Sequence, residues 1–223
     1  MEIISQDALK AWKSVLAYVM QHGKPVHHRQ RDSIDCLNLL VTVLQVAKRI
    51  EEPITALNSL GRWVYPSLEE IEECVMPTGK TRNYIYTYGP RLFNVDSKNQ
   101  VDDFLIPLLK NRPETGRAVL LTWDTRHDSQ ASGREMPGIV AFDFKLREGA
   151  LNATAFIRSN DMFFGWPANI YQTYVLQKYV AGKLGARLGA ISTFSTSAHV
   201  YDDTLPHIKK ILGKRMKSGD AAG

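Results

Sequence analysis

The residues best suited to chemistry lie in one short stretch, RSNDMFFGWPANI, at positions 158–170. Arg158 and Ser159 could hold a phosphate, because a guanidinium fork and a hydroxyl both donate hydrogen bonds to phosphate oxygens. The amide of Asn169 offers one acceptor and two donors, which can pair with the imide edge of a uracil. The residues alone leave a plainer alternative open, in which Arg158 is a surface charge and Asn169 only caps a helix.

The elements around this stretch must bring its side chains together. Residues 139–146 and 150–158 read as two strands joined by a short glycine-containing turn, which predicts a β-hairpin. Apolar residues at helical spacing predict a long helix from Asn169, its N-cap, to Leu184. The other predicted elements are helices from Ala8 to Gly23, from Pro66 to Val75 and from Val101 to Leu109, and strands at 34–46, 117–124 and 190–194. Because helices and strands do not alternate regularly, we expect an α+β fold in a single domain, 1–223.

Composition narrows the class of protein. No apolar run is long enough to span a bilayer, and the charged N-terminus lacks the order of a secretory signal, so we expect a cytoplasmic protein without a membrane partner. A net charge of +5 favours anionic partners, but much of the excess lies in a C-terminal tail that is more often solvated than bound to nucleic acid. The adjacent histidines His27 and His28 lack a third ligand, so no metal site is expected.

Three blocks of this sequence resemble the signature blocks of thymidylate synthases and the related pyrimidine nucleotide hydroxymethylases. They are RSND, GWPANI and the later SAHVY, and their spacing fits without gaps. Upstream, YTYGPRLF and PETGRAVLLTWD resemble two further blocks of the same family. The resemblance covers roughly residues 84–201, in a wording close to the compact archaeal-type branch. It implies the thymidylate synthase-like fold, a mixed β-sheet packed with helices, and a homodimer formed sheet to sheet.

The resemblance also implies a binding site for a pyrimidine nucleoside monophosphate. Arg158 and Ser159 would bind its 5′-phosphate, and Arg117 would reach the phosphate in the neighbouring subunit. Asn169 would read the base, and an amide at this position suits uracil better than cytosine. The sugar hydroxyl at O3′ would be held by His199 and Tyr201.

Further residues are implied to face a folate and the reaction centre. The one-carbon donor of the family is 5,10-methylenetetrahydrofolate, and Asp161 would contact its pterin. Gly165 would let the pyrimidine ring approach the backbone, and Tyr88 would line the reaction centre. The catalytic glutamate matches Glu72 in one alignment and Glu69 in another.

The nucleophile of the family is missing. The family has a cysteine after a proline in the loop before the hairpin, and this position is Gly138 here. A thiolate that adds to carbon 6 of uracil turns carbon 5 into a nucleophile, and a glycine cannot do this. Gly116 also replaces the first arginine of a family pair. Cys74 is a poor substitute, because its apolar helix position predicts a buried and unreactive thiol.

Two functions from different classes therefore stay open. One is an enzyme that transfers a methyl or hydroxymethyl group to a uracil-type nucleotide by a route without the usual cysteine. The other is a catalytically lapsed relative that binds a nucleotide or serves as a partner subunit.

Overall fold

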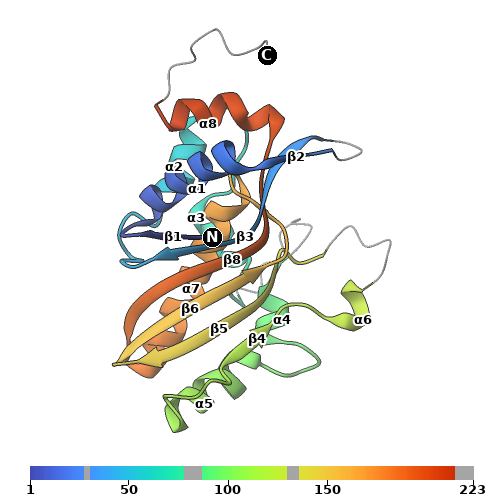
Figure 1. Cartoon of the computed structure of the whole chain (residues 1–223). Coiled ribbons are helices and arrows are strands. Elements are labelled where there is room, and N and C mark those ends of the chain that lie inside the picture. Colours follow the sequence, from blue (N-terminus) through green and yellow to red (C-terminus); the bar gives the residue numbers. More distant parts are fainter. Residues whose placement is uncertain (28–30, 78–86, 130–135, 214–223) are drawn as a thin grey trace, which may run out of the picture.

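The computed structural model describes residues 1–27, 31–77, 87–129 and 136–213. Its strands form one eight-stranded mixed sheet with the order β1-β3-β8-β6-β5-β4, in which β2 also pairs with β3 and β7 with β8 (Figure 1). The strands are β1 (Glu2–Ser5), β2 (Lys24–Val26), β3 (Ser33–Val43), β4 (Val119–Leu121), β5 (Ile139–Arg147), β6 (Ala150–Ile157), β7 (Asn160–Asp161) and β8 (Arg187–Tyr201).

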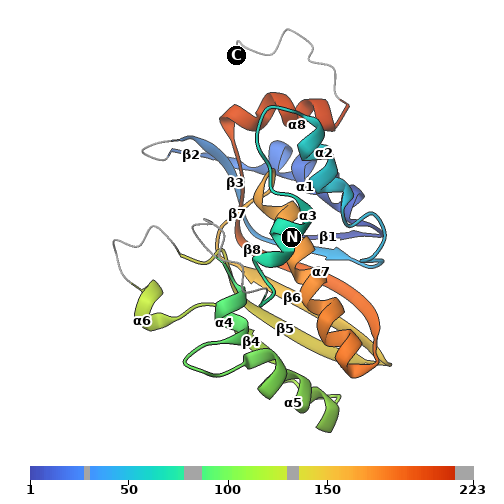
Figure 2. The ribbon, with the colours of Figure 1, turned by 180° about the vertical axis from the view of Figure 1, so that it is seen from behind.

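Helices pack against one face of this sheet. Seen from behind, α7 crosses in front of β6 and β8, with α3 beside it (Figure 2). The helices are α1 (Ala8–His22), α2 (Glu52–Ser59), α3 (Leu68–Glu73), α4 (Gly89–Phe93), α5 (Ile106–Asn111), α6 (Thr125–Asp128), α7 (Gly165–Leu184) and α8 (Leu205–Ile211), with a π-helix η1 (Gln100–Leu105) and a 3₁₀ turn η2 (Asp202–Thr204). Mixed strands and helices in this arrangement confirm the expected α+β class.

The core lies between the sheet and its helices. Strand residues alternate between the two faces, so the odd-numbered residues of β6 and the odd-numbered residues 191–195 in the middle of β8 point toward α7 and are buried. Two fully buried indoles link the layers, because Trp12 donates to the carbonyl oxygen of Met162 (2.8 Å) and Trp166 donates to Oγ1 of Thr193 (2.9 Å).

The hairpin before the site is confirmed. Strands β5 and β6 pair antiparallel from Arg147 opposite Ala150 to Ile139 opposite Ile157. The two turn residues, Glu148 and Gly149, both have a positive φ (50° and 71°), as the tight turns of two-residue hairpins require. The hairpin therefore delivers both chain ends, at Ile139 and Ile157, to the same end of the sheet.

The predicted start of the long helix is wrong. Helix α7 begins at Gly165, one turn before Asn169, and its N-cap is Phe164. The Gly-x-Pro sequence suggests a turn, but Pro167 lies in the first helical turn, where a missing N–H costs no helical hydrogen bond. As a result Asn169 lies within the helix rather than at its cap.

Other boundaries also differ from the prediction. The last strand, β8, extends over fifteen residues rather than five, because both of its edges find partners in β3 and β6. Strand β4 is only three residues long, and the predicted helix at 101–109 starts as a π-helix. The short elements β1, β2, β7, α2, α4, α6, α8 and η2 were not predicted. No helix in the described part of the chain combines the length and the apolar composition needed to cross a membrane.

Candidate functional site

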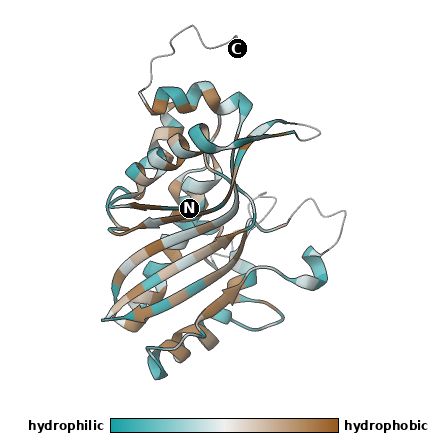
Figure 3. Cartoon of the chain, in the orientation of Figure 1, coloured by the Kyte–Doolittle hydropathy of each residue, from teal (hydrophilic) through white to brown (hydrophobic). Residues whose placement is uncertain are grey.

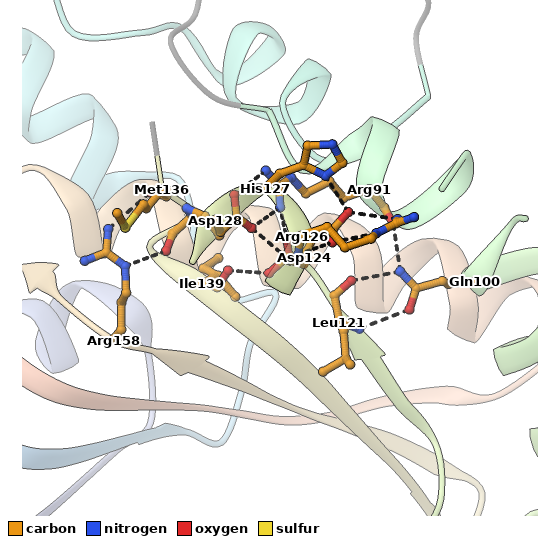
Figure 4. A network of polar contacts seen from close by, with 12 residues as sticks. Arg91, Gln100, Leu121, Asp124, Arg126, His127, Asp128, Met136, Ile139 and Arg158 are labelled. Atoms are coloured by element: carbon orange, nitrogen blue, oxygen red, sulfur yellow. Dashed lines mark hydrogen bonds and ion pairs between the residues drawn. The ribbon is translucent and has the colours of Figure 1, made fainter. Parts of the chain in front are cut away.

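Arg158 marks the end of β6 and is tied to the loop before β5. Its Nε donates to the carbonyl oxygen of Pro137 (2.9 Å), and its Nη2 donates to that of Met136 (3.2 Å) (Figure 4). Its backbone N–H donates to the carbonyl oxygen of Gly138 (3.0 Å). These bonds use two of the five N–H donors of the guanidinium, and both Arg158 and Ser159 are exposed. Arg158 can therefore brace the loop and still bind an anion.

The position of the missing nucleophile has room for a side chain. A Cβ added at Gly138 would lie 3.5 Å from Oη of Tyr88 and 3.8 Å from the carbonyl oxygen of Ser159, which are ordinary van der Waals contacts. The φ of Gly138 is not in the left-handed region. The backbone therefore does not require glycine here, and a cysteine would fit beside Tyr88.

Tyr88 is held against this position by its backbone and by its ring oxygen. Its Oη accepts the backbone N–H of Ile139 (3.0 Å), and its own N–H donates to the carbonyl oxygen of Cys74 (2.6 Å). The next residue must be glycine, because a Cβ at Gly89 would lie 2.7 Å from the carbonyl oxygen of Met76. Burial raises the pKa of Tyr88 above its usual value, so the phenol stays protonated near neutral pH.

A polar network braces the strand end that faces Tyr88. Arg91 of α4 forms a bidentate ion pair with the buried Asp128 and also donates to the carbonyl oxygen of Thr122 (2.7 Å). The hydroxyl of Thr122 donates to the carbonyl oxygen of Ile139 (Figure 4). Because α4 carries Tyr88 and β5 follows Gly138, this network fixes the two relative to each other.

A cleft of about 530 Å³ lies beside this network, between α4 and the end of β4. Its charged side chains pair with one another: Arg126 with Asp96 (2.7 Å) and Asp124 (3.1 Å), and His127 with Asp124 (2.8 Å). Hydrogen bonds from Arg126 and His127 hold the pKa of Asp124 well below its usual range. The cleft thus has partnered charges of both signs and no evident preference for a ligand.

Asn169 faces the segment that follows Arg158. Its Nδ2 donates to Oδ1 of Asn160 (3.1 Å), a buried residue that the sequence analysis did not single out. Gly165 lies against both amides, because a Cβ there would be 3.3 Å from Oδ1 of Asn160 and 3.9 Å from Nδ2 of Asn169. The structure therefore brings Gly165 and Asn169 together with Arg158 and Asn160 at one end of the sheet.

His199 and Tyr201 lie on β8 next to the same segment. His199 pairs in register with Asp161 of β7 on one side and with Asp35 of β3 on the other. The hydroxyl of Ser197 donates to Oδ2 of Asp35 (2.9 Å), so its oxygen faces Nδ1 of His199 (3.5 Å) as an acceptor. Asp35 and Ser197 were missed, since only strand register shows that they flank a histidine.

Tyr201 carries a cation on its ring. The guanidinium of Arg31 lies 3.9 Å from the ring centroid and forms a bidentate ion pair with Asp203, with Nη2 2.8 Å from Oδ2. Arg31 thus covers one face of the Tyr201 ring and holds Asp203 beside it.

Asp161 is a partly desolvated carboxyl group at the start of the α7 segment. Its Oδ1 accepts the backbone N–H groups of Phe163 (2.9 Å) and Phe164 (3.2 Å). Burial is the largest influence and raises its pKa to about 6, although these two hydrogen bonds act in the opposite direction. A carboxyl group of this kind changes its charge just below neutral pH.

The structure separates two expected site residues from the rest. Gly116 and Arg117 lie beside Lys145, because the Nζ of Lys145 contacts the carbonyl oxygen of Gly116 (3.5 Å). Lys145 is seven residues from Gly138 along β5, or about 23 Å at ~3.3 Å per residue. Arg117 is therefore at the opposite end of the strand from its own chain's site.

The glutamates of α3 also differ from the expectation. Glu72, one of the two candidates for the catalytic glutamate, is exposed and lies beside Tyr171 of α7. Glu73 is buried next to Cys74, whose carbonyl oxygen accepts the N–H of Tyr88. The sequence analysis did not single out Glu73, because only packing shows its burial.

The remaining candidates are placed as follows. Cys74 is buried, its thiol donates to the carbonyl oxygen of Glu70 (3.3 Å), and burial raises its pKa, as predicted for an unreactive thiol. His28 lies outside the described residues, and His27 is paired with Asp32. Within the described ranges no group of three or more potential metal ligands is found.

The pKa of Asp161 predicts a pH-dependent stability. The folded protein holds the proton more tightly than the unfolded chain, so the free energy of unfolding should fall as the pH rises from about 4 to about 6. Asp161→Asn should remove this fall, because an amide does not titrate, while its side-chain oxygen can still accept the two N–H groups. Denaturant unfolding at pH 4.5 and 7.5 measures the free energy of unfolding of both proteins. The variant should gain on the order of 2 kcal/mol relative to the wild type between these values. Parallel pH curves for the two proteins would contradict the shifted pKa.

Comparison with known proteins places this arrangement in a family. The sequence model for "Thymidylate synthase" matches residues 72–220. A "Putative thymidylate synthase" of Methanococcoides burtonii is 32% identical over 204 residues, or 91% of this chain and 90% of the relative. One of Methanosarcina barkeri is 31% identical with the same coverage. The thermostable thymidylate synthase A of Bacillus subtilis has a TM-score of 0.64 at 20% identity, over 94% of this chain and 85% of that one. The fold, the matched blocks and these archaeal relatives together show that this chain belongs to the thymidylate synthase family.

Proposed function

We propose that this protein binds a uracil-type pyrimidine nucleoside monophosphate at the end of the sheet where β6, β7 and β8 meet. The observation that carries the proposal is the convergence of three sequence segments there. Residues 158–161, 165–169 and 195–201 are linked by the register of β7 with β8 and by the bond between Asn160 and Asn169. The first of these segments carries the guanidinium of Arg158, and the second carries the amide of Asn169. The third carries His199 and Tyr201.

The parts of the ligand follow this order. The exposed Arg158 and Ser159 supply donors for a phosphate, and an arginine suits two phosphate oxygens at once. Asn169 supplies the amide for the base. His199 and Tyr201 supply hydrogen-bonding groups for the sugar, and Ser197 favours the tautomer of His199 that has a hydrogen on Nδ1 and an acceptor at Nε2.

We propose folate-dependent one-carbon transfer as the reaction class, on the strength of the family. The donor would be 5,10-methylenetetrahydrofolate, which supplies the one-carbon unit. Asp161 fits a contact with its pterin, because this carboxyl group is bound through Oδ1 to the backbone and is partly desolvated. Whether a methyl or a hydroxymethyl group results depends on steps after the transfer.

The chemistry at carbon 6 must differ from that of a cysteine enzyme. Tyr88 lies beside Gly138, but its raised pKa keeps it protonated, so it can orient a water or the base rather than attack it. The second candidate function, a catalytically lapsed nucleotide-binding relative, is favoured by the same glycine. Both candidate functions, the one-carbon transferase and the lapsed relative, require the same nucleotide site.

We further propose a homodimer formed through the helix-free face of the sheet. One row of cross-strand partners on this face is Leu40, Phe194, Phe156, Ala141 and Leu121. Leu121 is 56% exposed and Phe156 is 38% exposed, and apolar residues recur along these strands in Figure 3. A face of this kind is typical of a protein interface. In such a dimer Arg117 would bind the phosphate in the partner subunit, since the site of its own chain is at the other end of β5.

The dimer predicts a change of mass in solution. Phe156→Glu should convert a species of twice 25.2 kDa into the monomer, because the charge would be buried at the interface. Sedimentation at micromolar concentration measures this, with Lys178→Glu on the exposed side of α7 as the matched control. A wild type that sediments as a monomer at that concentration would contradict the proposal.

Arg158 should decide affinity for the phosphate. Arg158→Ala should weaken the binding of dUMP or UMP by ~2 kcal/mol, as the loss of a charge-assisted contact does. Uridine and deoxyuridine should bind the variant and the wild type alike, and Arg147→Ala, at another exposed arginine, should leave both affinities unchanged. Titration calorimetry measures the four affinities. An equal loss for nucleoside and nucleotide would show that Arg158 acts only by bracing the loop at Pro137.

Gly138→Cys separates the two candidate functions. The wild type should release no tritium from 5-tritiated dUMP, because no thiolate forms the enolate that labilises this hydrogen. Regained release in the variant would show that the rest of the site is competent and that only the nucleophile was lost. Gly138→Ser is the control for size. Tritium release by the wild type would contradict the view that Gly138 prevents covalent catalysis, and retained nucleotide binding without release in the variant would favour the lapsed relative.

A further inference from the structure

The orientation of the Asn169 amide is set by its hydrogen-bond partner, Asn160, which is buried. Asn160 is 1% exposed, and its Nδ2 donates to the hydroxyl oxygen of Ser195 (3.0 Å). Ser195 is itself fully buried. Its Oδ1 then accepts from Nδ2 of Asn169 (3.1 Å). The three side chains form one chain of hydrogen bonds that runs from the interior to the base position.

We infer that Asn160 is a positioning residue that sets base selectivity by fixing which end of the Asn169 amide faces it. The inference rests on the proposed function, in which Asn169 reads the pyrimidine. With Nδ2 bound to Asn160, the second hydrogen of Nδ2 is directed to O4 of a uracil, and Oδ1 accepts from N3–H.

Cytosine needs the opposite orientation. It presents an acceptor at N3 and a donor at the exocyclic nitrogen, so Asn169 would have to turn its amide over. Oδ1 of Asn169 would then face Oδ1 of Asn160, and two acceptors would meet at a buried position. Relieving this contact requires the amide of Asn160 to turn over as well, which changes Ser195 from the acceptor of that hydrogen bond to its donor. Asn160 thus disfavours cytosine without touching the base.

The surroundings hold Asn160 in this position. A Cβ at Gly165 would lie 3.3 Å from Oδ1 of Asn160, so glycine at the start of α7 leaves space for the amide pair. Asn160 pairs in register with Ala198 of β8, and the next residue, Asp161, accepts the backbone N–H of Phe163 just before α7. With its backbone fixed on both sides, the side chain of Asn160 has little freedom to move away.

Three variants test the inference through the ratio of the affinities for dUMP and dCMP. Asn160→Leu has the same branching but no acceptor, so the Asn169 amide can turn over and the ratio should fall about tenfold, the effect of one lost hydrogen bond. Asn160→Asp keeps an acceptor toward Asn169 and should keep the ratio of the wild type. Ser195→Ala removes the anchor of Asn160 and should lower the ratio in the same direction.

Asn152→Leu is the matched control. Asn152 is a half-buried amide of β6 that bonds to the backbone of Lys145 and Ala190 and lies away from the site. Its loss should lower stability and leave the ratio unchanged. If Asn160→Leu keeps the ratio of the wild type, or if Asn160→Asp loses it to the same extent as Asn160→Leu, the inference is overturned.

A second readout does not depend on nucleotide binding. In ¹H–¹⁵N spectra of the ligand-free protein, one hydrogen of the Asn169 amide should exchange slowly with solvent, because it is bonded to Asn160. This protection should persist in Asn160→Asp and disappear in Asn160→Leu. If the wild type binds neither nucleotide, the proposed function fails, whereas equal protection in all three proteins overturns the role of Asn160.

Discussion

The site depends on the close approach of three backbones at the end of β8. The chain leaves β6 at Arg158, runs beside β8 for the two residues of β7, and enters α7 within four residues of Asp161. A Cβ on the first helical residue, Gly165, would lie 3.3 Å from Oδ1 of Asn160, so that this side chain would have to shift by a few tenths of an ångström. The groups proposed for the phosphate and the base are carried on this short path, and those proposed for the sugar lie on β8 beside it.

The site is also shaped by how its polar groups are partnered. Asn160 lies between Ser195 and Asn169, Ser197 lies between Asp35 and His199, and Arg158 is bonded to the loop before β5. Each of the groups proposed to face the nucleotide is therefore held by a neighbouring side chain or carbonyl oxygen. Pre-organisation of this kind lowers the entropy lost on binding.

The surroundings of Gly138, the position of the family's nucleophile, decide whether a side chain could act there. The position is not strained, it has room for a side chain, and it is braced by Tyr88 and by the ion pair of Arg91 with Asp128. A cysteine introduced at this position would therefore meet a braced backbone beside Tyr88.

The sequence by itself determined the hairpin, the first helix and the segment that carries the site. Their signals are local: apolar spacing and a glycine-containing turn depend only on neighbours in the chain. Resemblance to family blocks also predicted Arg158, Asn169 and His199 as site residues. Local reasoning placed the start of α7 four residues too late, since Gly-x-Pro resembles a turn when the hydrogen bonds of Asp161 to the backbone of Phe163 and Phe164 are not visible.

Only the tertiary structure decided which groups support the site. Asn160, Ser195 and Asp35 have no sequence signal of their own, because their partners come from strands up to 162 residues away and are set by register. Burial of Glu73 rather than Glu72 depends on how α3 packs against α7, which periodicity over six residues cannot resolve. The distance of Arg117 from its own site likewise follows from strand pairing. Long-range register and packing are properties of the folded chain, and no window of sequence contains them.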